Sequence, residues 1–162
     1  MCGILAAIGC SDLELAVKQS SKMNHRGPDE RGHQLISSYP GGVVLCHERL
    51  SIMDLSTGRQ PIQGTRDNYL IHNGEIYNHQ ELRSNLQKNP KTRTTSDSEI
   101  IIHLWEEEKV NTANLLDGVF SFVLVDGEEV YAARDPIGVK PLFYGYDQNN
   151  AIWISSEQKA LV

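Results

Sequence analysis

The sequence predicts an α+β fold with layered, largely antiparallel sheets. Short apolar runs flank two turn signals, Asp126-Gly127 and Asn149-Asn150, as in β-hairpins. Two helical patterns lie between these strands and an earlier group of strands, and this order favours an α+β architecture. Because 162 residues suffice for one compact core, we expect a single domain over residues 1–162.

The N-terminal third is expected to contain strands around one helix. Residues 3–8 are apolar and predict a buried strand that begins almost at the first residue, so the N-terminus must be tied into the core. Ser11, with a glutamate three residues later, resembles a capping box and predicts a helix that ends near Asn24. Residues 34–37 and 43–47 have strand character on either side of a Pro-Gly-Gly turn, so we expect a hairpin there.

The middle of the chain is expected to form a loop, a strand and two helices. Residues 53–67 lack periodicity and predict a long loop, of the kind that tends to be functional. Residues 69–72 predict a strand that runs into an Asn-Gly turn. Asn78 and Ser96, each with a glutamate three residues later, predict the starts of the two helices.

The composition excludes several classes of protein. The net charge is −6 and the 15 lysines and arginines are scattered, so no basic stripe suits nucleic acid. The longest apolar stretches, residues 119–125 and 100–105, are too short to span a membrane, and the N-terminus lacks the basic region of a signal peptide. Three cysteines without a C-x-x-C pair suit a reducing compartment. We therefore expect a cytoplasmic protein that binds neither nucleic acid, membrane nor metal.

Cys2 is the first candidate for chemistry. Removal of Met1 would leave this residue with both a thiol and a free α-amine. An α-amine titrates near ~7.7–8.0 and a thiol near ~8.5, so the amine can take the thiol proton directly or through a water. The alternative interpretation is that Cys2 is merely a small residue near the start of the chain and has no function. The mechanism also requires removal of Met1, because a residue still attached to Cys2 would abolish the free amine.

Further positions could complete such a site. The Asn73-Gly74 turn could point a side-chain amide and a backbone N–H at one oxygen, as an oxyanion hole requires, although a plain β-turn has the same signature. Arg49 could hold a carboxylate in two parallel hydrogen bonds, and Asp97, at the first turn of a helix, could pair with an α-ammonium. A surface ion pair for Arg49 and a favourable helix-dipole position for Asp97 stay open as alternatives.

The remaining motifs indicate no metal or nucleotide site. The six histidines lack ligand spacing, and we interpret them as structural or exposed. Neither a P-loop nor a dinucleotide-binding glycine motif occurs in the sequence.

Eight motifs follow one another along nearly the whole chain. They are MCGI at residues 1–4, HRGPD at 25–29, HERLSIMD at 47–54, NGEIYNH at 73–79, SDSEI at 96–100, LLDGVFSFVLVD at 115–126, ARDPIGVKPLFY at 133–144 and SSEQKAL at 155–161. In this order they resemble the class II glutamine amidotransferases of the N-terminal nucleophile hydrolase group, and most closely the glutaminase domain of asparagine synthetase. HERLSI and NGEIYN separate this subgroup from its relatives.

The resemblance implies a four-layer αββα sandwich that hydrolyses L-glutamine to L-glutamate and ammonia through a γ-glutamyl thioester on Cys2, without a cofactor. It implies that Asn73 and Gly74 are the oxyanion donors, and that Arg49 and Asp97 clamp the carboxylate and the amine of the substrate. The glutamine pocket would be completed by backbone groups of Leu50, Ser51, Ile52 and Met53, and by Glu75.

Members of this family pass ammonia to a second domain that adenylates aspartate with ATP and Mg²⁺. The sequence stops at Val162 and contains no S-G-G-x-D-S pyrophosphatase loop, so we expect a fragment of the longer enzyme. A stand-alone glutaminase is the alternative. The expected partners are L-glutamine and a C-terminal synthetase domain in cis or in trans, with a homodimer left open. Two other functions also stay open: a catalytically silent binding module, and an amidotransferase for another acceptor.

Overall fold

Two β-sheets face each other in this computed structural model, which describes residues 1–51, 58–88 and 90–161. Neighbouring strands in both sheets are antiparallel. The five-stranded sheet contains, in spatial order, β2 (Glu30–Ile36), β3 (Val43–Arg49), β1 (Gly3–Ile8), β9 (Ile152–Ser155) and β8 (Phe143–Tyr146). The four-stranded sheet contains β4 (Ile62–Gln63), β5 (Asn68–Ile76), β6 (Gly118–Asp126) and β7 (Glu129–Arg134).

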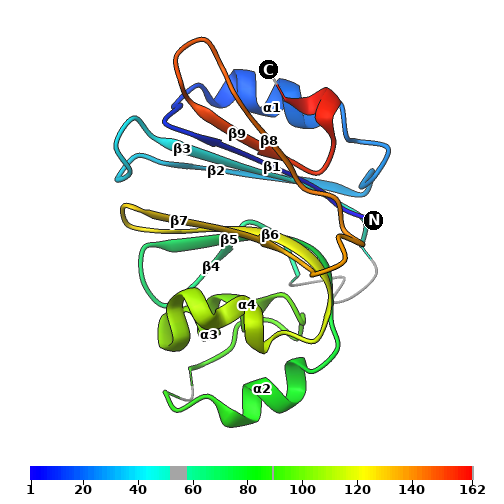
Figure 1. Ribbon diagram of the computed structural model, residues 1–162, viewed down its shortest axis with the longest axis vertical. Coiled ribbons are helices and arrows are strands. Elements are labelled where there is room, and N and C mark those ends of the chain that lie inside the picture. Colours follow the sequence, from blue (N-terminus) through cyan, green and yellow to red (C-terminus); the bar gives the residue numbers. More distant parts are fainter. Residues whose placement is uncertain (52–57, 89, 162) are drawn as a thin grey trace.

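Helices form the two outer layers, as Figure 1 shows. The five-stranded sheet is covered by α1 (Leu13–Ser21) and the 3₁₀ helix η2 (Gln158–Ala160). The four-stranded sheet is covered by α2 (His79–Asn85), α3 (Glu99–Glu108), the 3₁₀ helix η1 (Lys109–Asn111) and α4 (Thr112–Leu115). The predicted α+β class and the four-layer αββα order are therefore confirmed.

Strand β1 is buried on both faces, and its side chains alternate between two cores. Ile4, Ala6 and Ile8 lie between the two sheets, whereas Leu5 and Ala7 pack in the core that contains Ala16 of α1. The strand lies between β3 and β9, so it occupies the centre of its sheet. This placement ties the first residues of the chain into the core, as predicted, and holds Cys2 at one end of the sandwich.

Two predicted helix starts are wrong in detail, whereas Asn78 is the N-cap residue of α2. Asp12, and not Ser11, caps α1, because its Oδ1 accepts a hydrogen bond from the N–H of Leu15 at 2.9 Å. Ser96 does not cap α3, which begins only at Glu99. The carboxylate of Glu99 instead accepts the backbone N–H of Arg93 at 2.8 Å. In both places another local side-chain to backbone hydrogen bond has replaced the predicted capping box.

The loop expected at residues 53–67 is only partly confirmed. It contains the short strand β4, which pairs with β5 at Leu70 and Tyr69. Residues 52–57 lie outside the described residues. The short helix α4 was not predicted.

The prediction of a turn at Asn73-Gly74 is wrong, because both residues lie inside β5. They are paired with Ser121 and Phe120 of β6. Gly74 has a φ of 153°, and a Cβ at this position would lie 2.1 Å from the carbonyl oxygen of Val119. The close approach of the β6 backbone therefore requires glycine here.

Candidate active site

One cavity of about 110 Å³ lies at the end of the sandwich where β1 begins and β3 ends. Alternation along the strands explains which side chains reach it. In β3, Val43 and Leu45 face the other sheet, so Arg49 lies on the same side of the strand. In β5, Ile71 faces the other sheet and Asn73 follows it on that side. The cavity lining includes the predicted site residues Cys2, Arg49, Leu50, Asn73, Gly74, Glu75 and Asp97.

Cys2 is held from two directions. Its Sγ lies 3.4 Å from the backbone N–H of Leu50 and 3.8 Å from the carbonyl oxygen of that residue. Its own carbonyl oxygen accepts a hydrogen bond from Nε of Arg26 at 2.9 Å. Met1 is 54% exposed. The bond that must be cleaved to release the Cys2 amine is therefore next to a solvent-exposed side chain.

The side-chain amide of Asn73, which the sequence predicts as an oxyanion donor, lies in the cavity lining. Asn73 is 1% exposed, and its Nδ2 has no hydrogen-bond partner among the residues that the structure describes. Buried amide groups are nearly always paired, because an unpaired one costs about 1–3 kcal/mol. An unpaired donor beside Cys2, in the wall of a cavity, suits an oxygen that arrives with a substrate.

Arg49 and Asp97 place opposite charges in the same cavity, and both are 5% exposed. Nη1 of Arg49 donates to Oε2 of Glu30 at 2.9 Å. Oδ2 of Asp97 accepts the backbone N–H of Ile76 at 2.7 Å, which ties this carboxylate to the end of β5. Asp97 precedes α3 by two residues, so its predicted place in the first turn of a helix is wrong.

The structure places the other predicted pocket residues unequally. Leu50 and Glu75 line the cavity. The backbone N–H of Ser51 donates instead to Oδ2 of Asp29 at 2.7 Å, and Ser51 is not among the lining residues. Ile52 and Met53 lie outside the described residues.

Two histidines that the sequence analysis interprets as structural or exposed, His47 and His72, line the cavity and are each 1% exposed. Nε2 of His47 lies 3.1 Å from the carbonyl oxygen of His72 and must donate to it, which joins the two sheets beside the cavity. Nδ1 of His72 lies 2.8 Å from Oγ of Ser98, the residue after Asp97. His47 lies two residues before Arg49, and His72 lies directly before Asn73. This proximity was a usable signal, because residues close together on a strand reach the same end of a sheet.

The sequence is matched over residues 1–162 by the family model of the glutamine amidotransferase domain. The chain belongs to this family. It is 46% identical to glutamine-hydrolyzing asparagine synthetase 1 of Arabidopsis thaliana over 169 residues, which cover 99% of this chain and 28% of that protein. It is 44% identical to glutamine-hydrolyzing asparagine synthetase of Sandersonia aurantiaca, with 99% of this chain and 31% of that protein covered. The amidotransferase chain thus spans less than a third of these relatives.

Solved structures share the fold of this amidotransferase domain. Glutamine phosphoribosylpyrophosphate amidotransferase from B. subtilis superposes with a TM-score of 0.82 at 20% identity, over 98% of this chain and 42% of that one. None of the helices among residues 1–51, 58–88 and 90–161 is long and apolar enough to cross a membrane. In the same ranges, no group of three or more histidine, cysteine or acidic side chains is arranged to hold a metal ion.

Burial lowers the pKa of both cavity histidines, so we expect the stability of the amidotransferase domain to depend on pH in the acid range. Burial lowers the pKa of His47 to about 3 and the pKa of His72 to about 4. In the unfolded chain a histidine titrates near ~6.5, so between about pH 6.5 and 4 the unfolded state binds protons that the folded state does not. We expect the free energy of unfolding to be full above this window and to fall by roughly 1.4 kcal/mol per pH unit for each histidine as the pH drops through it.

Urea unfolding at pH 7, 6 and 5 measures this dependence. His72→Gln should reduce the slope of stability against pH, whereas the same change at the exposed His33 should leave it unaltered. An unchanged slope in the His72 variant would show that its imidazole is not a source of the acid sensitivity.

Proposed function

We propose that this chain, with Cys2 at its N-terminus after removal of Met1, hydrolyses L-glutamine to L-glutamate and ammonia. The supporting observation is the meeting of Cys2 and the unpaired Asn73 amide in one cavity that also contains Arg49 and Asp97. A nucleophile, an oxyanion donor and two opposite charges are the groups that an amino acid with a side-chain carboxamide requires.

The reaction begins with proton transfer from the Cys2 thiol to the α-amine of the same residue. The thiolate attacks the carboxamide carbon of glutamine, and the oxygen that becomes negative is stabilised by the Asn73 amide and the Gly74 N–H. The tetrahedral species collapses, the C–N bond breaks, and the ammonium of Cys2 returns its proton to the leaving nitrogen, which departs as ammonia. Water then attacks the γ-glutamyl thioester with the same amine as base, and glutamate and the thiol are released.

Charge complementarity orients the substrate. Arg49 would hold the α-carboxylate of glutamine, and Asp97 its α-ammonium, so that only the carboxamide reaches Cys2. Leu50 and Glu75 also line the cavity and would complete the substrate contacts. Because the chemistry requires only these side chains and water, we propose no cofactor for this domain.

The ammonia would be used by a synthetase domain that follows this chain. The curated relatives are named as glutamine-hydrolyzing asparagine synthetases, and this chain corresponds to 28–31% of their length. We propose that the remaining part binds ATP and Mg²⁺ and adenylates aspartate, and that the protein acts in the cytoplasm. Feeding ¹⁵N-amide glutamine with different acceptors to the complete protein tests this, because label in asparagine supports aspartate and label elsewhere identifies another acceptor.

The glutaminase activity is tested with a glutamine analogue that carries an electrophile at the amide carbon. We expect intact-mass spectrometry to show one adduct on the Met1-free protein, and peptide mapping to place it on Cys2. Competition by L-glutamine should slow its formation. Protein that has lost Met1 but forms no adduct, and releases no glutamate from glutamine, would be a silent binding module instead.

A further inference from the structure

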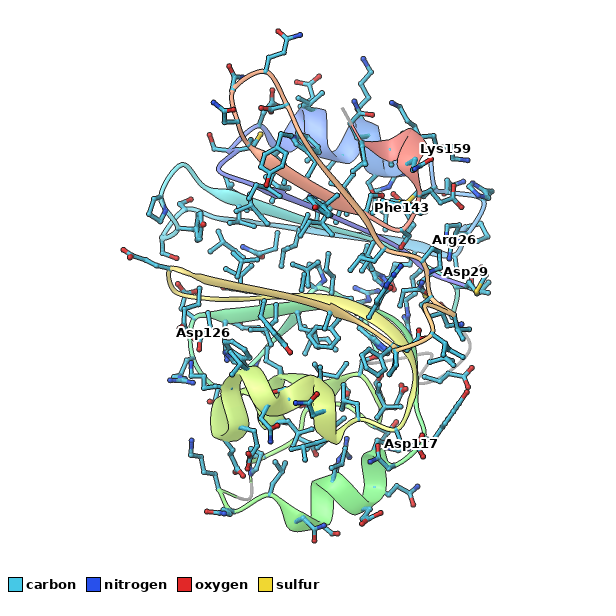
Figure 2. All side chains as sticks on the ribbon, viewed as in Figure 1. Arg26, Asp29, Asp117, Asp126, Phe143 and Lys159 are labelled. Carbon is cyan, nitrogen blue, oxygen red and sulfur yellow. The ribbon has the colours of Figure 1, made fainter. Side chains whose placement is uncertain are left out.

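A chain of contacts joins the last strand of the fold to the proposed nucleophile. Oε1 of Glu157, two residues after β9, accepts a hydrogen bond from Nη1 of Arg26 at 3.0 Å. Nε of the same guanidinium donates to the carbonyl oxygen of Cys2 at 2.9 Å. Figure 2 shows Arg26 on the same side of the molecule as Lys159 and Asp29. Arg26 thus connects Glu157 with the backbone of Cys2.

The ion pair between Arg26 and Glu157 is partly withdrawn from water. The Arg26 side chain is 9% exposed, and the Glu157 side chain is 23% exposed. A guanidinium withdrawn this far from water needs a partner of opposite charge, and the carboxylate of Glu157 supplies it. Glu157 also accepts contacts from His25 and Lys159, both at 3.1 Å. Burial raises the pKa of Glu157, but the hydrogen bonds from Arg26, Lys159 and His25 hold it below its usual value, so this residue is ionised at neutral pH.

The contacts around Cys2 determine where its nitrogen points. Its carbonyl is fixed by Arg26, and its sulfur by the N–H of Leu50 at 3.4 Å. Since the Cα of Cys2 is tetrahedral, fixing the carbonyl carbon and the side chain also fixes the direction of the third heavy substituent, the nitrogen. Two residues further on, Ile4 exchanges two hydrogen bonds of 3.0 Å with Ser156, the neighbour of Glu157. The segment 156–157 therefore anchors the start of β1 at two points.

We propose that Glu157 is a positioning residue, which acts through Arg26 to hold the α-amine of Cys2 where it can take the proton of the thiol. This inference rests on the proposed glutaminase function and adds a residue from the opposite end of the chain to it. Glu157 does not line the cavity, so it touches neither the substrate nor the reacting atoms.

The ion pair also has an electrostatic effect that a purely structural contact would lack. The guanidinium of Arg26 favours the uncharged form of a neighbouring amine, and the carboxylate of Glu157 offsets part of this effect. The other charged or titratable groups nearby are His25 and Lys159, which contact Glu157, and the cavity-lining residues His47, Arg49, His72, Glu75, Asp97 and Lys140. Removing the Glu157 charge alone should make the amine lose its proton at lower pH.

The test compares Glu157→Gln, Glu157→Asp and Glu157→Ala in the protein that carries this chain, with glutamate release as the assay. For the glutamine variant we expect kcat to fall about tenfold because the Arg26 contact loosens, while KM stays within about twofold. The acid limb of the kcat/KM profile should move to lower pH by roughly half a unit. The aspartate variant keeps the charge, so its acid limb should stay at the wild-type position. The alanine variant loses the charge and the contact and should lose more kcat than the glutamine variant.

The matched control is Glu128→Gln, which removes an exposed carboxylate in the turn between β6 and β7 and should change neither kcat nor the profile. Wild-type kcat and an unmoved acid limb in Glu157→Gln would overturn the inference. If the glutamine variant fails to fold, the aspartate variant provides the test. Because this variant keeps the negative charge, a shift of its acid limb by the roughly half a pH unit expected for loss of the charge would also overturn the inference. Absence of glutamate release from the wild-type protein would instead contradict the proposed function.

Discussion

Replacing Cys2 with alanine should abolish glutamine hydrolysis, with a loss of roughly 10⁴-fold or more in kcat. Alanine is small enough for Met1 still to be removed, so the mature N-terminus and its amine remain. What disappears is the sulfur that forms the thioester. The fold should persist, because alanine keeps the backbone carbonyl of residue 2 that accepts the hydrogen bond from Arg26. Glutamate release at saturating glutamine measures the effect.

Binding of glutamine and the behaviour of a second cysteine are the controls for this variant. Arg49 and Asp97 are untouched, so calorimetry should show glutamine binding with an affinity close to wild type. Cys10 is also partly exposed and follows β1, and Cys10→Ala should keep full activity. Hydrolysis that survives in the Cys2 variant at the wild-type rate would assign the nucleophile to another residue.

Several strands of the fold were predictable because they depend on local patterns, whereas the four-layer order was implied by the family resemblance. The apolar residues 3–8 predict β1, and the Asp126-Gly127 turn predicts the β6–β7 hairpin, in which Gly127 has a φ of 62°. Both are short-range signals whose tertiary context agrees with them. The turn at Asn73-Gly74 was predicted wrongly because the same dipeptide that favours hairpin turns is here paired along its length with β6.

The candidate site was predictable in its residues but not in its geometry. The motifs that carry Cys2, Arg49, Asn73 and Asp97 mark these positions, and the structure brings all four to one cavity. No local rule connects Arg26 with Glu157, which are 131 residues apart, or His72 with Ser98. Such contacts depend on which strands become neighbours, and this is decided by packing of the complete core rather than by any one segment.

Replacing Asn73 with alanine should lower kcat for glutamine hydrolysis about 10²- to 10³-fold, which corresponds to roughly 2.7–4 kcal/mol of transition-state stabilisation. The amide acts on the oxygen as it becomes negative, so KM should change much less than kcat. Nδ2 of Asn73 has no partner among the described residues, so the substitution removes no hydrogen bond of this group that stabilises the fold. A stopped assay of glutamate release over a range of glutamine concentrations separates the two constants.

Two further variants distinguish loss of the oxyanion donor from general disturbance of β5. Asn73→Asp keeps the shape of the side chain, but replaces a donor with a negative charge that repels the developing oxyanion, so its kcat should be at least as low as that of the alanine variant. Asn149→Ala, in an exposed turn, should be fully active. If Asn73→Asp kept most of its activity, the amide could not be the donor, and the unpaired nitrogen would need a different explanation. We expect low activity in the Asn73→Asp variant because burying an unpaired nitrogen costs stability. A fold that leaves such a donor unpaired beside its nucleophile gains nothing from it until a substrate oxygen arrives.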